Sequence, residues 1–219
     1  MAEKEITVGL FILVRHGQTA GNRDKIYRGR WDLPLDEDGL DQVERAGRAL
    51  GSLHLDAIYT SPLLRTRQTA EAVARHQAVE PVVEEGLLDI DYGQWTRQPD
   101  ERIAREQARL YRLWHARPQE VVFPRGEGLA QVRRRVEDMF VRLAPRHATE
   151  TVALVGHRVS VKMMLLVALG LDDSAFWKVQ VDTASLSALR HHDDGWQLLF
   201  ANETCHLKEL GERLRPVDF

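Results

Sequence analysis

The amino-acid sequence predicts an α/β fold: a three-layer sandwich with a largely parallel central sheet and helices on both faces. Three observations support this prediction. Short apolar runs typical of buried strands alternate with longer segments whose apolar residues recur at helical spacing. No internal repeat or low-complexity tract interrupts that alternation. No stretch resembles a linker, so we expect one domain over residues 1–219, in which crossover helices join the strands.

The first half of the chain is predicted to contain three strands and two helices. The apolar run Val8–Val14 has the length and composition of a buried strand. Residues Asp36–Leu53 begin with acidic side chains, which favour a helix N-terminus, and continue with apolar side chains at helical spacing. Ala57–Tyr59 predicts a second strand that leads into a helix ending near His76, and Val82–Val83 predicts a short third strand.

The second half continues the alternation and closes on a hairpin. The predicted elements, in order, are a helix over Gln98–His115, a loop over Pro118–Gly128, a helix over Leu129–Leu143, a strand over Thr151–Val155, a helix over Val161–Leu169 and hairpin strands over Leu186–Leu189 and Trp196–Phe200. Between the hairpin strands lies His191-His192-Asp193-Asp194. We expect a turn there rather than a metal site, because adjacent residues in a turn rarely converge on one ion.

Composition limits the classes of function. The apolar fraction of 43% and the charged fraction of 29% are ordinary for a globular protein, and a net charge of −3 gives no indication of nucleic-acid or anionic-membrane binding. Cys205 is the only cysteine, which excludes an intramolecular disulfide and predicts a reducing compartment. Met1–Glu5 lacks a secretory pattern, and the apolar run behind it stops at Arg15, too soon for a membrane span. We therefore expect a cytoplasmic protein.

Two predicted strands end in the same way, each with a histidine. Val8–Val14 is followed by Arg15 and His16, and the strand that begins at Thr151 is followed by Gly156-His157. In an open α/β sheet, ligands bind beyond the carboxyl ends of the strands. A histidine there can act as nucleophile or base, and an adjacent arginine can hold an anion. One histidine near a strand end is more often structural, but two predict a site.

A third strand end contributes an arginine. Within Ser61–Ala70, Arg65 is predicted on the first turn of the helix that follows the strand Ala57–Tyr59. An arginine in that position is usually solvated, yet the N-terminus of a helix already favours anions. The three strand ends together predict a site for an anionic group.

These segments resemble one known family. Arg15-His16-Gly17-Gln18-Thr19 with Asn22, the stretch Ser61–Ala70 and Gly156-His157 are similar to the histidine phosphatase superfamily, also called the phosphoglycerate-mutase-like proteins. The similarity spans nearly the whole chain in the right order. It implies that His16 attacks a phosphate monoester in line and becomes a phosphohistidine.

The resemblance also implies how the transferred phosphate is held. Arg15, Arg65 and His157 would surround its equatorial oxygens, and Thr19 and Asn22 would add neutral hydrogen bonds. It implies neither a metal nor another cofactor, because the protein itself supplies the positive charge.

The proton donor is where this chain departs from that family, whose members usually carry a glutamate in a Leu-x-Glu-x-x-x-Gly setting. Asp89 stands at the matching position within Leu87–Trp95, and its side chain is one methylene shorter. The resemblance implies that Asp89 is the general acid to the leaving oxygen and the base to the attacking water. Asp91 is the alternative, since it lies on the same face if the segment is extended. Glu84 and Glu85 are expected in a solvated loop.

Substrate contacts are expected in two further places. The superfamily resemblance implies a cap over the phosphate pocket from an insertion at about residues 95–127. Arg28-Gly29 matches a loop near the non-phosphate end of the substrate, where Arg28 would hold a carboxylate; an exposed loop arginine is the alternative. Trp114, within the insertion, is expected in the core rather than in a substrate cavity.

The segment Asn202–Leu207, together with Phe176-Trp177 and Asp182–Ser185, resembles a metal-independent phosphoserine phosphatase branch of the family. Phosphoserine is therefore a candidate substrate, although that branch can carry histidine at the position of Tyr92. For His206, the alternative to a substrate contact is a structural hydrogen bond near the end of the chain. The remaining candidate substrate contacts are Tyr92, Arg158 and His206.

Other charged groups are predicted to be solvated. Arg133-Arg134-Arg135 lies on an amphipathic helix and is expected on its solvated face. Four histidines near predicted helix ends are expected to contact solvent or cap a helix. They are His54, His76, His115 and His147.

Three functions fit these residues. The leading one is a metal-independent phosphatase acting on a small phosphate monoester, such as phosphoserine or another phosphorylated carboxylic acid. A bisphosphoglycerate-dependent phosphoglycerate mutase would use the same phosphohistidine, although Arg30 and Arg158-Val159 depart from the mutase pattern. A non-catalytic phospholigand-binding protein is the third. The expected partner is a small phosphate ester, and a homodimer contact stays open at the hairpin edge or the apolar helix.

Overall fold

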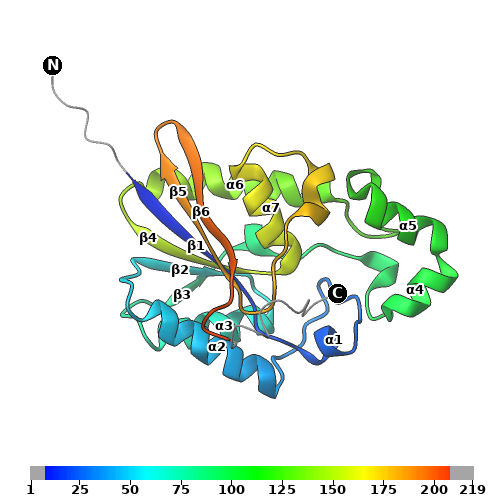
Figure 1. Ribbon diagram of the computed structural model, residues 1–219, viewed down its shortest axis with the longest axis horizontal. Coiled ribbons are helices and arrows are strands. Elements are labelled where there is room, and N and C mark those ends of the chain that lie inside the picture. The colour runs from blue at the N-terminus through cyan, green and yellow to red at the C-terminus, as the bar shows by residue number, and fades with distance from the viewer. Residues whose placement is uncertain (1–7, 208–219) are drawn as a thin grey trace.

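The computed structural model describes residues 8–207 and has a six-stranded mixed sheet at its centre (Figure 1). The strands are β1 (Gly9–Arg15), β2 (Ala57–Thr60), β3 (Pro81–Val83), β4 (Thr151–Gly156), β5 (Leu186–His192) and β6 (Gly195–Glu203). Their order across the sheet is β3-β2-β4-β1-β5-β6. The first four in this order run parallel, and β5 and β6 form an antiparallel hairpin beside β1. The predicted α/β class with a largely parallel sheet is confirmed.

Helices lie on both sides of this sheet, as Figure 1 shows. The α-helices are α1 (Ala20–Arg23), α2 (Glu37–Leu50), α3 (Leu64–Ala74), α4 (Asp100–Glu106), α5 (Ala108–Ala116), α6 (Leu129–Arg146) and α7 (Arg158–Ala168). Short 3-10 helices are at Glu85–Leu87, Gly93–Trp95, Pro118–Glu120 and Asp173–Lys178. α2 packs on α3 and α6 packs on α7, whereas α4 and α5 lie to one side. The three-layer arrangement is therefore also confirmed.

Strand β1 is buried on both faces, which explains its unbroken apolar sequence. Phe11 and Leu13 belong to the core shared with α6 and α7. Ile12 and Val14 belong to the core shared with α2 and α3. Because successive side chains of a strand point to opposite faces, a central strand between two helical layers must be apolar at every position.

The register of β1 and β4 positions the two histidines. The strands pair in parallel from Leu10 opposite Thr151 to Arg15 opposite Gly156. His16 and His157 are the next residue on each strand, so they leave the sheet side by side at its carboxyl edge. The shared pattern of the two strand ends is thus a consequence of their pairing.

Two of the differences from the predicted helix boundaries have a clear side-chain cause. The helix expected over Gln98–His115 is broken at Gln107, whose backbone is not helical (φ −125°, ψ 40°) and whose side-chain oxygen accepts a hydrogen bond of 2.7 Å from Trp95 Nε1. The helix expected from Val161 begins earlier, because Ser160 Oγ accepts a hydrogen bond of 2.9 Å from the His157 amide and so caps the helix N-terminus. The helical periodicity of the sequence gives no information about either of these side-chain contacts.

The turn of the hairpin and the burial of Trp114 agree with two expectations from the sequence. The turn between β5 and β6 lies at Asp193 and Asp194, as expected. Within residues 8–207, no group of three or more histidine, cysteine or acidic side chains could hold a metal ion. In the same residues, every helix is too short or too polar to cross a membrane. Trp114 is fully buried among aromatic side chains, which agrees with its expected place in the core.

Candidate active site

The backbone of His16 is held between two neighbouring segments at the carboxyl edge of the sheet. Its amide donates to Gly156 O at 3.0 Å, and its carbonyl accepts from Ala184 N at 3.1 Å. Ala184 has a positive φ of 52°, a conformation that non-glycine residues rarely adopt. The backbone from which the imidazole extends is therefore held by hydrogen bonds at both the amide and the carbonyl of His16.

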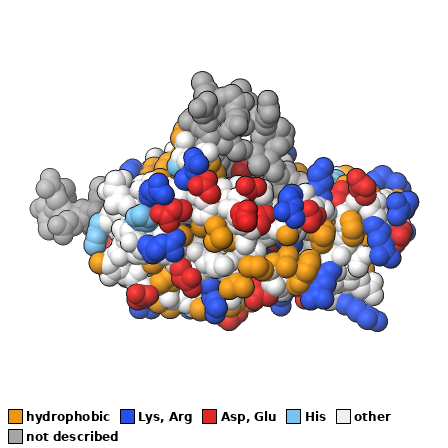
Figure 2. Space-filling view, turned by 90° about the horizontal axis from the view of Figure 1, so that it is seen from below, with side chains coloured by type: hydrophobic (Ala, Val, Ile, Leu, Met, Phe, Trp, Pro, Cys, Tyr) orange, Lys and Arg blue, Asp and Glu red, His pale blue; other side chains and the backbone are white. Residues whose placement is uncertain are grey.

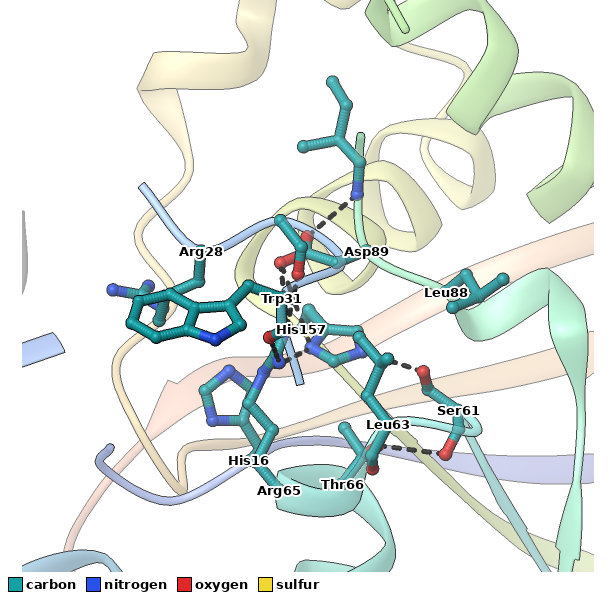
Figure 3. Close-up of polar contacts among 12 residues, drawn as sticks. His16, Arg28, Trp31, Ser61, Leu63, Arg65, Thr66, Leu88, Asp89 and His157 are labelled. Atoms are coloured by element: carbon teal, nitrogen blue, oxygen red, sulfur yellow. Dashed lines mark hydrogen bonds and ion pairs between the residues drawn. The ribbon is translucent and has the colours of Figure 1, made fainter. Parts of the chain in front are cut away.

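The imidazole of His16 presents one nitrogen with a lone pair. Its Nδ1 lies 2.6 Å from Gly17 O, and because a carbonyl oxygen can only accept, Nδ1 carries the proton. Nε2 is then unprotonated and available as a nucleophile. The ring packs edge-on against His157, with 5.3 Å between the ring centroids (Figure 3).

His157 is held in the opposite tautomer. Arg65 Nε lies 3.2 Å from His157 Nδ1, and because a guanidinium only donates, Nδ1 is the acceptor. The Nε2 proton then donates to Ser61 Oγ at 2.8 Å. The segment Ser61–Ala70 thus supplies two partners that orient one histidine. No role was predicted for Ser61, although a polar residue directly after a strand is a signal that could have identified it.

Burial and neighbouring guanidinium groups lower the pKa of both histidines well below 6.5. For His16 the main cause is loss of hydration, followed by the charges of Arg65 and Arg15. For His157 the main cause is again burial, followed by the charge of Arg65. Both imidazoles are therefore neutral at neutral pH, which is the protonation state that a nucleophile needs.

Arg65 is completely buried in the centre of this cluster (Figure 3). Its Nη1 donates to Trp31 O at 2.9 Å and its Nη2 donates to Gly29 O at 2.7 Å. Nη2 also lies 3.4 Å from Asp89 Oδ2. The arginine is therefore not solvated, contrary to the usual behaviour of that helical position, because a loop folds its carbonyl groups over it.

The other predicted anion-binding residues lie around the same histidines. Arg15 is buried and its Nη1 donates to Val181 O at 2.7 Å. Asn22 Oδ1 accepts from the amide and the hydroxyl of Thr19, at 3.1 and 2.9 Å. The side-chain nitrogen of Asn22 is buried and has no hydrogen-bond partner within residues 8–207. A buried donor without a partner costs free energy, so it indicates a position where a ligand acceptor would bind.

Of the two candidate proton donors, Asp89 faces the histidines. Its Oδ2 lies 3.9 Å from His157 Nδ1, and its Oδ1 accepts from Ile90 N at 3.0 Å. The segment is not a strand, so the alternation that would place Asp91 beside Asp89 does not apply. Asp91 instead accepts from Gly93 N at 2.8 Å, within its own turn.

Next to Asp89 is a small cavity, whose volume of about 10 Å³ is close to the least that holds one water molecule. Arg28 lines it, and its Nη1 donates to Gly21 O at 3.0 Å. At only 7% exposure, Arg28 is not the exposed loop arginine that was the alternative. The cavity is also lined by Ile26, Tyr27, Gly29, Tyr92, Arg158 and Val159.

The hydroxyl of Tyr92 and the guanidinium of Arg158 interact at this cavity. Burial raises the pKa of Tyr92, and both the charge of Arg158 and its hydrogen bond to the tyrosine oppose that rise. The guanidinium of Arg158 also lies over the ring of Trp177, 5.6 Å from its centroid. These two predicted substrate contacts therefore hold each other in place beside Asp89.

His206 contacts the segment that holds the backbone of His16. Its ring nitrogen Nε2 is 3.1 Å from Ala184 O, and Ala184 N in turn contacts the carbonyl of His16. The structure thus shows the backbone hydrogen bond that was the alternative role for this histidine, while its contact with substrate stays a prediction.

One expectation about charged residues is wrong. The arginine run on α6 is not simply solvated: Arg133 pairs with Asp173 at 2.7 Å, and Arg135 donates to the carbonyl groups of Leu88 and Asp89. Only its middle residue is exposed. His147 is the C-cap residue of α6, one of the two roles expected for it, and its buried ring lies 2.9 Å from the hydroxyl of Tyr59 on β2. Helical periodicity does not show which long side chains reach a neighbouring segment.

The lowered histidine pKa values predict that the free energy of unfolding falls as pH falls from about 7 to about 5. The unfolded chain binds protons at histidines near pH 6.5, whereas folded His16 and His157 resist protonation, so stability is complete above that pH and is lost on acidification. Each histidine contributes at most about 1.4 kcal/mol per pH unit. Urea unfolding at both pH values should show a smaller acid loss for His16→Asn than for the wild type. Equal loss in both proteins would contradict the prediction, and His54→Asn, which changes an exposed histidine, is the control.

Comparison with known protein families gives a match over most of the chain. The family model described as histidine phosphatase superfamily (branch 1) matches residues 11–204. Phosphoserine phosphatase 1 of Hydrogenobacter thermophilus is 36% identical over 198 residues, which is 90% of this chain and 94% of that protein. The adenosylcobalamin/α-ribazole phosphatase of Escherichia coli is 26% identical over 177 residues, or 81% of this chain and 87% of that protein.

Solved structures show the same fold. Bacillus stearothermophilus YhfR superposes with a TM-score of 0.86 at 25% identity, covering 91% of this chain and 99% of that one. A phosphoserine phosphatase from Entamoeba histolytica, in complex with phosphoserine, superposes with a TM-score of 0.82 at 22% identity, again over 91% and 99% of the two chains. At that identity the likeness supports the fold alone.

Proposed function

This chain belongs to branch 1 of the histidine phosphatase superfamily and is a phosphatase, and we propose that it hydrolyses small phosphate monoesters through a phosphohistidine on His16, without a metal ion. The observation that carries the proposal is the lone pair on Nε2 of a neutral, buried His16, which lies among His157, Arg15 and Arg65. A neutral imidazole can attack phosphorus, and the arginines supply the positive charge that the phosphoryl group requires.

In the first step, Nε2 of His16 forms a bond to phosphorus while the bond from phosphorus to the ester oxygen breaks. The electron pair goes to the leaving oxygen, which takes a proton from the carboxyl of Asp89. Asp89 is the acid in this proposal because its carboxyl lies 3.9 Å from Nδ1 of His157 and lines the same small cavity as Arg28 and Arg158.

In the second step, water attacks the phosphorus of the phosphohistidine. The carboxylate of Asp89 accepts the proton of that water, the bond from phosphorus to Nε2 breaks, and inorganic phosphate leaves. The arginines and the unpaired amide nitrogen of Asn22 hold the phosphoryl oxygens throughout. Nothing in this cycle is consumed except ester and water, and His16 returns to its neutral form.

The substrate class follows from the charges beside Asp89. Arg28 and Arg158 line the small cavity next to Asp89, and two guanidinium groups beside the acid favour a leaving group that carries its own negative charge. We therefore propose a phosphorylated carboxylic acid, with phosphoserine as the leading candidate because the 36% identical relative is named a phosphoserine phosphatase.

A substrate panel with EDTA present tests this proposal. We expect phosphate release from phosphoserine to exceed release from phosphoethanolamine, which lacks only the carboxylate. Arg158→Gln should raise the KM for phosphoserine by about 10-fold and change the KM for phosphoethanolamine by less than about 3-fold, as expected for a lost charge-assisted hydrogen bond. The two esters thus act as a matched pair within each protein.

Other outcomes of the panel would overturn parts of the proposal. Equal effects of Arg158→Gln on the KM values of both esters would show that Arg158 does not contact the substrate carboxylate. Release that stops with EDTA would contradict metal independence. Isomerisation of 3-phosphoglycerate that depends on bisphosphoglycerate, without phosphate release, would indicate a mutase instead.

A further inference from the structure

Arg135 on α6 reaches the backbone that carries the proposed acid. Its Nη2 donates to Leu88 O at 3.1 Å and to Asp89 O at 3.0 Å. Its side chain is only 18% exposed, although it belongs to a run of three arginines. One nitrogen therefore binds two successive carbonyl groups, and the second of these belongs to Asp89 itself.

The second terminal nitrogen of Arg135 binds Glu127. Its Nη1 lies 3.0 and 3.1 Å from the two carboxylate oxygens. Glu127 continues the link, because its Oε2 accepts from Asp91 N at 3.1 Å and its own amide donates to Asp91 O at 2.9 Å. The backbone is thus held at residues 88, 89 and 91, on both sides of the Asp89 side chain.

The same carboxylate also holds the loop that covers Arg65. Arg30 Nη2 donates to Glu127 Oε1 at 2.7 Å. The residues on either side of Arg30 are Gly29 and Trp31, whose carbonyl groups accept hydrogen bonds from Arg65. Glu127 therefore joins the two segments that meet at Arg65, one bringing carbonyl groups and the other bringing Asp89.

We propose that Arg135, paired with Glu127, is a positioning residue that fixes the carboxyl of Asp89 within reach of the leaving oxygen. This inference rests on the proposed function, in which Asp89 is the acid. Aspartate has a short side chain with two torsions, so the place of its carboxyl depends closely on its backbone. A planar guanidinium can hold a carboxylate and two carbonyl groups at once, which a lysine ammonium with one flexible point charge cannot do.

The test compares Arg135→Gln with Arg134→Gln, because Arg134 is the adjacent residue of the same helix and is exposed. In a single turnover, Arg135→Gln should slow alcohol release from phosphoserine by about 10- to 100-fold, the effect of a small misplacement of a catalytic group. Release of 4-nitrophenol from its phosphate, which needs no protonation, should slow less than about 3-fold, and the KM for phosphoserine should change little. Arg134→Gln should match the wild type on both esters.

A double-mutant cycle separates positioning from general structural damage. If Arg135 acts through Asp89, adding Arg135→Gln to Asp89→Asn should cause little further loss with phosphoserine. If it acts independently, the two losses should multiply. Multiplied losses, or equal slowing of both esters by Arg135→Gln, would overturn the inference.

Two controls make the result interpretable. Arg135→Lys retains the charge opposite Glu127 and should give an intermediate rate with phosphoserine, so it replaces Arg135→Gln if the latter does not fold. Wild-type activity separates the two proposals. A wild type that hydrolyses no ester in the panel overturns the proposed function and this inference with it, whereas an active wild type and an Arg135→Gln protein that matches Arg134→Gln overturn the inference alone.

Discussion

His16→Ala is expected to lower kcat for every ester that the wild type hydrolyses by about 10⁴-fold or more, as loss of a nucleophile does in other covalent enzymes. The imidazole is the only protein group that bonds to phosphorus in the proposed cycle. Arg15, Arg65 and His157 remain in the variant and still form an anion-binding site, so inorganic phosphate should bind to it. Loss of turnover with retained phosphate binding would separate the nucleophile from the pocket.

Rapid quenching measures the covalent step directly. Wild-type protein mixed with radiolabelled ester and quenched in alkali should carry an acid-labile, alkali-stable label, and a peptide map should place that label on His16. His16→Ala should carry none, whereas His54→Ala, which removes an exposed histidine, should be labelled as the wild type is. A label on another residue, or turnover by His16→Ala above about one per cent of wild type, would contradict the phosphohistidine mechanism.

Asp89→Asn is expected to slow the first turnover of phosphoserine by about 10²- to 10⁴-fold, the range that general acid catalysis contributes. The substitution preserves shape and keeps one oxygen, which can still accept from Ile90 N, while the amide nitrogen takes the place of the oxygen that faces Arg65. What it removes is the proton for the leaving oxygen. An alkoxide is a poor leaving group without that proton, whereas 4-nitrophenolate leaves unaided, so the aryl ester should slow less than about 10-fold.

Asp91→Asn is the matched control for this prediction, since the two carboxylates are two residues apart. Asp91 accepts a hydrogen bond from Gly93 N, and Asp91→Asn should leave the rates of alcohol and phenol release nearly unchanged. The measurement is the rate of alcohol or phenol release in a single turnover for both variants. Equal slowing of both esters by Asp89→Asn, or a larger effect of Asp91→Asn on phosphoserine, would remove Asp89 from the role of acid.

Much of the fold could be predicted because it depends on local pattern. β1 is apolar from Leu10 to Val14 and β4 from Val152 to Val155 because both of their faces are covered, and such runs are recognisable in a sequence. The break at Gln107 was missed because it depends on a hydrogen bond to Trp95, a partner twelve residues away that helical periodicity does not include. The buried role of Arg135 was missed for the same reason, since its partners lie on another segment.

By itself, the sequence determined the α/β class, the family, and the strand ends from which His16 and His157 leave the sheet, because apolar periodicity and short motifs are properties of neighbouring residues. Only the tertiary structure decided the protonated nitrogen of each imidazole, the choice of Asp89 over Asp91 as the carboxylate beside the histidines, and the link from Arg135 to that carboxylate. These properties depend on hydrogen bonds and burial between segments distant in the chain. Such contacts exist only once the core has brought those segments together and removed their water.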